Sequence, residues 1–398
     1  MPCAASTLAG VIRVALLSVL IAASVHAASL DDQLRTAQQL AWQKRFSEAE
    51  RIYREVLARA PKSRAAALGL GQVLLWEQRY ADAADVYRRL LPDAEARKGL
   101  ATAEYWAGDF RSALRDFALV NDADARKAIA DIKAASAPLA GVDAAFSSDD
   151  QPLRRAVGSA AYTFFSDPLT TWTASAGTYA FDPHATAPFA SVAGSTVFPW
   201  QRLRTGGTLR VLRFPDGRNG ILGGVNVTRG ALAFDVDRHE LLYTLGALHN
   251  HPSETTTTLA WKNATSQVAV HAIRYFDHNN GRAADAYHLQ HVAGPLSLGA
   301  AASYRDTDES RFNGTAYDPY WTPQRLAEGR IIAAATFGKV KLHVDGGWAH
   351  DAVNGAFHPW RASADVALPA GATLTMERQS TIFYRATSFH LTIVRRVE

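Results

Sequence analysis

The sequence predicts a mainly β chain with an N-terminal α part: a short solenoid of helical repeats, then an antiparallel transmembrane β-barrel of about 16 strands, about 12 to 16 being compatible. Three observations predict this fold. Apolar and polar side chains alternate with a period of two from about residue 139 onward, as in Lys339–Trp348 and Trp360–Leu368. The residues before them follow a helical period and repeat themselves. Residues 1–27 have the pattern of a secretory signal.

The signal begins with a weakly basic region that ends at Arg13, followed by the apolar run Val14–Ser24 and the small residues around Val25-His26-Ala27. That run is too short to cross a bilayer as a helix, and no later stretch approaches about 20 apolar residues. The single cysteine, Cys3, lies in the segment that we expect to be removed. We therefore expect no disulfide and no thiolate metal site. The formal charge of +4, with both signs interleaved, indicates no nucleic-acid partner.

The helical segment, residues 28–136, carries one pattern three times. Each copy has four residues in a fixed order. A tryptophan is followed after four residues by an aromatic residue, then after three by an alanine, and after four more by a second aromatic residue. The positions are Trp42, Phe46, Ala49 and Tyr53; Trp76, Tyr80, Ala83 and Tyr87; Trp106, Phe110, Ala113 and Phe117. A period near 34 residues with small residues at helix crossings resembles tetratricopeptide repeats. The alternative is a generic helical bundle. We expect the alanines to lie where two helices approach closely. We expect the aromatic residues, including the tryptophans, to pack between helices rather than to stack on a ligand.

The strand-rich segment, residues 137–398, contains about sixteen predicted strands. Their centres are Ala144, Ala160, Ala176, Gly194, Thr208, Val225, Asp237, Thr258, Val270, His288, Ala300, Ala334, Val344, Ala364, Thr375 and Leu391. Even-numbered connections are short turns, whereas odd-numbered ones include Pro215–Gly220, Asp277–Ala284 and the longest, Asp306–Glu328. A soluble sandwich has no reason to sort its connections in this way. Outer-membrane barrels do, with short periplasmic turns and longer external loops.

Aromatic residues gather near predicted strand ends, where rings suit the two lipid–water interfaces. They are Phe164, Phe165, Phe181, Phe198, Trp200, Phe214, Phe276, Phe337, Trp348, Trp360 and Tyr384. Strands are generally rich in aromatic residues, so this observation alone does not separate a barrel from a sandwich.

The polar faces of the strands would line the interior of the barrel. The predicted lining is Arg202, Arg204, Arg210, Lys341, His343, Asp345, Arg361, Asp365 and Glu377. The Arg202–Arg210 strand is a basic ladder that could attract anionic solutes or donate hydrogen bonds to sugar hydroxyls. Alternatively, the charged lining residues pair with one another and only keep the interior polar. We expect no catalytic residue, no cofactor and no metal ion: His249-Asn250-His251 reads as a surface loop, and no nucleophile elbow or phosphate loop occurs.

Repeats joined to a barrel resemble the exopolysaccharide-export proteins of Gram-negative bacteria, including the cellulose and poly-N-acetylglucosamine porins and, more closely, the smaller YaiO-type barrels. The most motif-like stretch is Tyr317-Asp-Pro-Tyr-Trp-Thr-Pro323. The resemblance implies an outer-membrane pore, or an accessory for polysaccharide export, with periplasmic repeats that bind a protein partner or the polymer. The alternatives are a non-transporting surface or scaffold protein that binds a phage or a matrix component, and an outer-membrane lipase or protease. No catalytic triad can be assembled for the latter.

Overall fold

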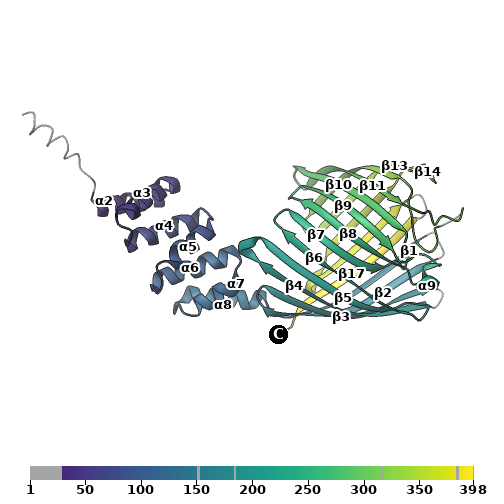
Figure 1. The fold of residues 1–398 in the computed structure, drawn as a ribbon, viewed down its shortest axis with the longest axis horizontal. Helices are drawn as coiled ribbons and strands as arrows, with labels where there is room; N and C mark the ends of the chain where they lie inside the picture. Colours follow the sequence, from purple (N-terminus) through teal and green to yellow (C-terminus); the bar gives the residue numbers. More distant parts are fainter. Residues whose placement is uncertain (1–28, 150–152, 183–184, 315–316, 382–384, 398) are drawn as a thin grey trace, which may run out of the picture. The chain divides into compact units, whose positions relative to one another are not determined.

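The computed structural model describes residues 29–149, 153–182, 185–314, 317–381 and 385–397. The predicted signal peptide, residues 1–27, lies outside the described residues. The chain divides between Ala130 and Asp131 into two compact units, a helical repeat unit and a barrel unit, and each is described by itself (Figure 1). Among the described helices, none is both long enough and apolar enough to cross a membrane.

The repeat unit is a series of antiparallel helices. They are α2 (Leu30–Trp42), α3 (Phe46–Arg59), α4 (Arg64–Trp76), α5 (Tyr80–Arg88), α6 (Ala94–Ala107), α7 (Phe110–Phe117) and α8 (Ala123–Ala135), of which α8 runs across the division. The side chains of Ser29, Ser63 and Asp93 cap α2, α4 and α6 by accepting hydrogen bonds from backbone N–H groups of the first turn. Pro61 and Pro92 follow α3 and α5 closely, as expected of residues that cannot continue a helix.

The repeats pack through small residues and rings. Ala49, Ala83 and Ala113 are fully buried, as the repeat pattern predicts. The ring of Tyr87 lies between two glycines of neighbouring helices: a Cβ atom on Gly71 or on Gly99 would come within 2.5 Å of it. Tyrosine on one helix and glycine on the next therefore set the distance between consecutive hairpins.

The three tryptophans correct the sequence-based expectation. Trp42, Trp76 and Trp106 are exposed by 72%, 42% and 62%, so they do not fill the core between hairpins. The buried stripe of α2 runs through Ala37 and Ala41, and Trp42 lies one position beyond it. Trp76 does touch the neighbouring hairpin, because its ring centroid lies 6.2 Å from that of Trp42. The other predicted packing aromatics, including Tyr53 and Phe117, are buried or half-buried.

The barrel unit is one closed antiparallel sheet. Its strands are β1 (Leu139–Asp149), β2 (Arg154–Asp167), β3 (Thr170–Asp182), β4 (Ala185–Phe198), β5 (Leu203–Arg213), β6 (Asn219–Arg229), β7 (Leu232–Glu240), β8 (Ser253–Lys262), β9 (Ser266–Tyr275), β10 (Asn280–Ala293), β11 (Leu296–Thr307), β12 (Leu326–Phe337), β13 (Val340–Asp351), β14 (Gly355–Phe357), β15 (Trp360–Ala367), β16 (Ala372–Ser380) and β17 (Arg385–Arg396). Each strand pairs with its neighbours in the chain, and β1 pairs with β17 to close the barrel. The three-residue β14 extends only the β13 hairpin, and β15 pairs directly with β13.

Apart from the short β14, the strands correspond to the sixteen predicted ones, and every predicted centre lies inside a strand. Side chains alternate strictly in exposure along β2 and less regularly along strands such as β6 and β17. The exposed face carries large apolar residues, whereas the opposite face includes the residues that line an internal cavity. Prominent exposed residues are Val192, Leu209, Ile221, Val225, Leu259, Val270, Ile331 and Val344.

The two ends of the barrel differ. Leu139 and Arg396 are paired at one end, here called the chain end, where all connections are short turns. The opposite end, the loop end, has the connections 214–218, 241–252, 276–279 and 308–325. The predicted connection Asp277–Ala284 is too long, since β10 begins at Asn280. The connection 241–252 was not predicted as a long one.

The aromatic residues at strand ends occupy two environments. Phe164, Phe198, Trp200, Phe337, Trp348 and Trp360 are exposed, which agrees with the predicted interface positions. Phe181 and Phe214 are only 4% exposed and lie in a buried cluster, so their predicted interface position is wrong. Tyr384 lies outside the described residues.

Candidate functional site

The interior of the barrel holds a cavity of about 880 Å³. Strands β1, β2, β7–β12, β16 and β17 contribute inward-facing polar side chains to it, as the period-two alternation predicts, together with residues of the connections at the loop end. Arginine, glutamate, aspartate and histidine side chains share this wall with leucine, alanine and aromatic side chains. The charged or titratable lining residues are Asp149, Arg155, His239, Glu254, His271, Asp285, Arg305, Glu328, Arg330 and Glu377.

Asp345 of β13 is the centre of a charged network on the inner face. Its carboxylate is 2% exposed and accepts hydrogen bonds from Arg330 at 3.0 Å and from Arg361 at 2.9 Å. His343 contacts the same carboxylate at 2.8 Å, and Arg330 also binds Glu328 at 2.8 Å. A buried carboxylate with several charge-assisted partners holds the three strands β12, β13 and β15 in register. Three predicted lining residues, His343, Asp345 and Arg361, thus meet at one point.

Arg210 of β5 is a second predicted residue with internal partners. Its guanidinium binds Glu240 at 2.8 Å and lies 5.2 Å from the ring centroid of Phe189. Tyr179 donates a hydrogen bond to the same glutamate at 2.6 Å. These contacts and the Asp345 network agree with the alternative that the interior charges pair with one another.

The remaining predicted lining residues are spread along the barrel. Asp365 accepts a hydrogen bond from Thr375 at 2.7 Å, and Glu377 lines the cavity. Arg204 and Lys341 alternate onto the inner face and remain solvent-exposed. Arg202 lies outside β5, in the turn at the chain end, where its positive φ of 49° ends a short helical turn. β5 therefore begins at Leu203, one residue after the Arg202 that the alternation of basic residues assigned to the strand.

Two connections of the loop end interlock. They are residues 241–252 between β7 and β8 and the described residues 308–314 and 317–325 between β11 and β12, and together they are called the plug. Thr244 donates a hydrogen bond to the carbonyl of Pro319 at 2.6 Å, and the Tyr243 hydroxyl accepts one from the Trp321 N–H at 3.2 Å. Gly246 lies so close to Asp318 that a Cβ atom there would clash with the carboxylate. The plug therefore behaves as one packed body.

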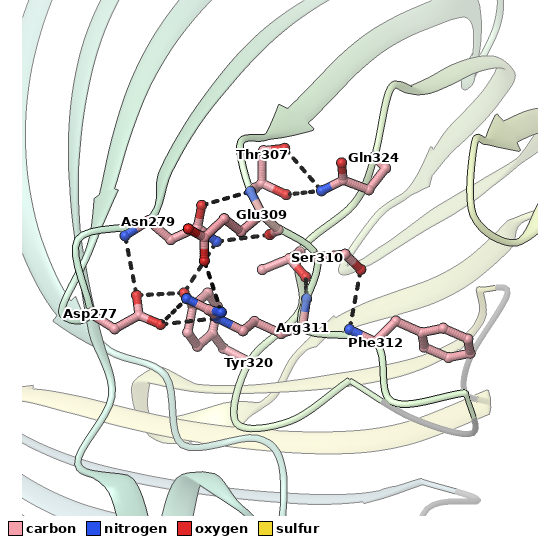
Figure 2. A network of polar contacts seen from close by, with 10 residues as sticks. Asp277, Asn279, Thr307, Glu309, Ser310, Arg311, Phe312, Tyr320 and Gln324 are labelled. Carbon is pink, nitrogen blue, oxygen red and sulfur yellow. Dashed lines mark hydrogen bonds and ion pairs between the residues drawn. The ribbon is translucent and has the colours of Figure 1, made fainter.

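A latch of polar contacts fastens the plug to the rim of the barrel (Figure 2). Asp277, in the turn between β9 and β10, accepts hydrogen bonds from Arg311 at 2.7 Å and from the Tyr320 hydroxyl at 2.7 Å. Asn279 donates to the carbonyl of Glu309 at 2.9 Å and accepts from its N–H at 3.0 Å. Figure 2 shows Arg311 and Tyr320 converging on Asp277 from the long connection.

Tyr320 is the anchor of this latch. Its side chain is fully buried, and its ring stacks on that of Tyr275 with centroids 4.3 Å apart. Burial, together with the hydrogen bond to Asp277, raises the pKa of Tyr320 to about 12. The hydroxyl therefore stays protonated and remains a donor at neutral pH. Tyr320 belongs to the motif-like stretch Tyr317–Pro323, of which Thr322 and Pro323 are also buried.

The other half of the plug rests on an apolar patch inside the barrel. Leu242 and Leu248 of the connection pack with inward-facing residues of β3, β5 and β6, among them Phe181, Leu212 and Leu222. The interior is thus apolar on one side of the loop end and polar across the cavity. His251, from the predicted His249–His251 loop, closes this region by contacting Asp216 at 2.8 Å.

Sequence reasoning missed several residues of the site. Glu328 and Arg330 alternate with the exposed Ile331, so their parity could have assigned them to the inner face. Glu240 and Glu254 lie at strand ends, where the alternation gives no assignment. No group of metal-ligating side chains suited to an ion is found among the residues that the structure describes.

Comparisons with known proteins agree with this architecture. The model of the tetratricopeptide repeat family matches residues 42–95. A solved bacterial polysaccharide outer membrane secretin aligns over 66% of this chain and 99% of its own, with a TM-score of 0.50 and 9% identity. Two substituted variants of a porin from Rh. blastica align over 65% of this chain and 99% of theirs, with TM-scores of 0.38 and identities of 10% and 11%. No curated protein matches by sequence. The chain thus combines tetratricopeptide repeats with a closed antiparallel barrel whose fold resembles that of the solved polysaccharide secretin.

Proposed function

We propose that this protein is an outer-membrane pore, or an accessory of such a pore, through which an exopolysaccharide leaves the cell. The observation that carries the proposal is a cavity of about 880 Å³, lined by arginine, glutamate, aspartate and histidine side chains among apolar ones, inside a barrel whose exposed face is apolar. An apolar exterior suits lipid, and a polar interior suits a hydrated, hydroxyl-rich solute. The barrel supplies a path and no chemical reaction.

The asymmetry of the two ends supports an orientation. Short turns lie on the periplasmic side of outer-membrane barrels and longer loops on the external side. With the chain end in the periplasm, the repeat unit is periplasmic and the plug closes the external mouth. The repeats then bind a periplasmic protein or the polymer.

A second function is favoured by the plug itself. Interlocked connections that line the cavity at the loop end, anchored by the buried Tyr320, also suit a non-transporting surface protein that binds a phage or matrix component. In that case the plug never leaves the mouth, and the cavity is only a structural void.

Conductance of the full chain in planar bilayers separates these functions. We expect rare openings of the intact protein and frequent, larger openings when residues 308–325 are replaced by a short Gly-Ser connection. The result that overturns the export function is no conductance from either protein, although both are inserted and heat-modifiable on gels. A second readout is surface polysaccharide in the native bacterium, which should fall when the protein is removed.

A further inference from the structure

The repeat unit carries three exposed tryptophans at equivalent positions, here called the tryptophan row: Trp42, Trp76 and Trp106. Trp42 and Trp76 end α2 and α4, and Trp106 is the residue before the end of α6. Because equivalent positions of stacked repeats lie along one edge of a solenoid, the three rings form a row. The 6.2 Å distance between the ring centroids of Trp42 and Trp76 agrees with this arrangement.

The backbone holds the row in a repeated geometry. Two residues after each tryptophan, the chain adopts a positive φ: 61° at Lys44, 61° at Gln78 and 81° at Gly108. The next residue then closes the turn with a hydrogen bond to the carbonyl five residues earlier, at 2.9, 2.9 and 2.8 Å. The repeats are 34 and 30 residues apart, yet the turn is the same in all three. The tryptophans are thus presented alike in three repeats.

The exposed apolar surface of the repeat unit is concentrated in this row. Within the described residues 29–130, the exposed large hydrophobic residues are Leu30, Trp42, Trp76, Trp106 and Leu119. Exposed polar side chains, including Gln43 and Gln78, lie in the turns that follow the tryptophans. A stable protein interface needs a continuous apolar patch with a polar rim. Contacts of the Trp76 ring with those of Trp42 and Phe46, at 6.2 and 5.8 Å between centroids, hold the first two indoles in place. Rings held in a line, with hydrogen-bonding groups in the same turns, suit a ligand with apolar faces and polar edges.

Most of the described charged residues that border the first two tryptophans are paired, Lys44 being the exception. Arg45 binds Glu48 through both its Nε and Nη2 atoms, at 2.6 and 2.5 Å. Arg79 binds Glu50 at 2.8 Å and Asp82 at 2.7 Å. In the third repeat, Asp109 caps α7 by accepting a hydrogen bond from the Ser112 N–H. This balance fits an uncharged ligand better than an acidic or basic polymer.

We propose that the tryptophan row binds a linear, uncharged glycan, one sugar ring stacking on each of two or three indoles. Sugar rings offer an apolar C–H face for an indole and hydroxyl edges for the neighbouring glutamines and arginines. Trp is enriched in such contacts because its large ring is rigid and half polar. This inference rests on the proposed export function only in taking the glycan to be the exported polymer. The repeat unit would then be the part of the protein that the polymer contacts first.

Isothermal titration of the full chain, in a detergent without a sugar head group such as lauryldimethylamine oxide, tests this proposal. The probes are cellohexaose, chitohexaose and maltohexaose, with trigalacturonate as the anionic comparison. We expect at least one neutral hexasaccharide to bind, and its affinity to fall about tenfold or more in the double variant W42A/W106A, because two ring contacts are lost. The variants W42F/W106F should recover part of that affinity. Leu119→Ala, which removes an equally exposed apolar side chain outside the row, is the matched control.

Three outcomes overturn the glycan site. These are no binding of any neutral hexasaccharide, preferential binding of trigalacturonate, and neutral binding that the W42A/W106A variant leaves unchanged. A synthetic amphipathic or proline-rich peptide that binds in place of the sugars assigns the row to a protein partner instead. Bilayer conductance of the same preparations keeps the two proposals apart. Conductance without glycan binding contradicts only the glycan site on the tryptophan row. Glycan binding without conductance contradicts only the proposed pore.

Discussion

Glu104 of α6 is a buried carboxyl group with acidic neighbours. Its side chain is 3% exposed. Burial, followed by the negative charges of Asp116 and Asp109, raises the pKa of Glu104 from 4.5 to about 8. The folded protein therefore keeps a proton that the unfolded chain has released between about pH 4.5 and pH 8. In that window the stability of the repeat unit falls as pH rises, by up to about 1.4 kcal/mol per pH unit.

Replacing the carboxyl by an amide should remove this dependence. We expect Glu104→Gln to unfold at nearly the same temperature at pH 5.5 and pH 8, whereas the unsubstituted protein loses helix stability toward pH 8. Thermal unfolding followed by the helical circular dichroism signal measures both. Glu55→Gln, at an exposed carboxylate of α3, serves as the control. A pH dependence that is the same with Glu104→Gln as without it would show that another group titrates.

At this scale the sequence predicted contacts made by small residues and missed those that depend on side-chain direction. Ala49, Ala83 and Ala113 recur with the repeat and are buried as expected. Gly69 and Gly99 also recur, each seven residues before a tryptophan, and they pack on Tyr53 and Tyr87; Gly71, on the other side of Tyr87, has no such counterpart. The tryptophans recur as regularly as the alanines. Repetition alone cannot tell a buried ring from a presented one.

The plug is held by contacts between elements distant in the sequence, and its latch is testable through two similar ion pairs. Arg311 is 26% exposed and binds Asp277 at 2.7 Å, whereas Arg282 is 75% exposed and binds Asp306 at 2.8 Å. We expect Arg311→Ala to increase the open probability in planar bilayers several-fold, because the loss of a half-buried pair leaves Asp277 without its main partner. Arg282→Ala should leave the open probability unchanged, because an exposed pair stabilises by at most about 1 kcal/mol. Equal effects of the two substitutions would contradict a specific latch.

Among the elements, the strands were predictable and the plug was not. Each strand repeats the same alternation over many residues, and all sixteen predicted centres are confirmed. The connection 241–252 carries Leu241, Leu242 and Leu248 without a period. Leu242 and Leu248 are buried against residues of β3 and β5, whereas Leu241 is buried against Ile273 and Tyr275 of β9. A loop that packs inward leaves no local pattern, so its fold is decided by tertiary contacts alone.

For the whole molecule, the assignment of a lipid face and a water face can be tested with two adjacent alanines of β2. Ala160 pairs with Ala176 on the exposed face, and Ala161 pairs with Ser175 on the inner face. A lysine at position 160 would enter the apolar layer, at a cost of about 2–4 kcal/mol near the bilayer midplane. A lysine at position 161 would face the polar interior. We therefore expect Ala160→Lys to fold into lipid vesicles far less completely than Ala161→Lys, as measured by heat-modified gel mobility and urea titration. If Ala161→Lys is the more damaging substitution, the apolar face does not meet lipid; if both fold equally well, residue 160 lies outside the hydrocarbon layer.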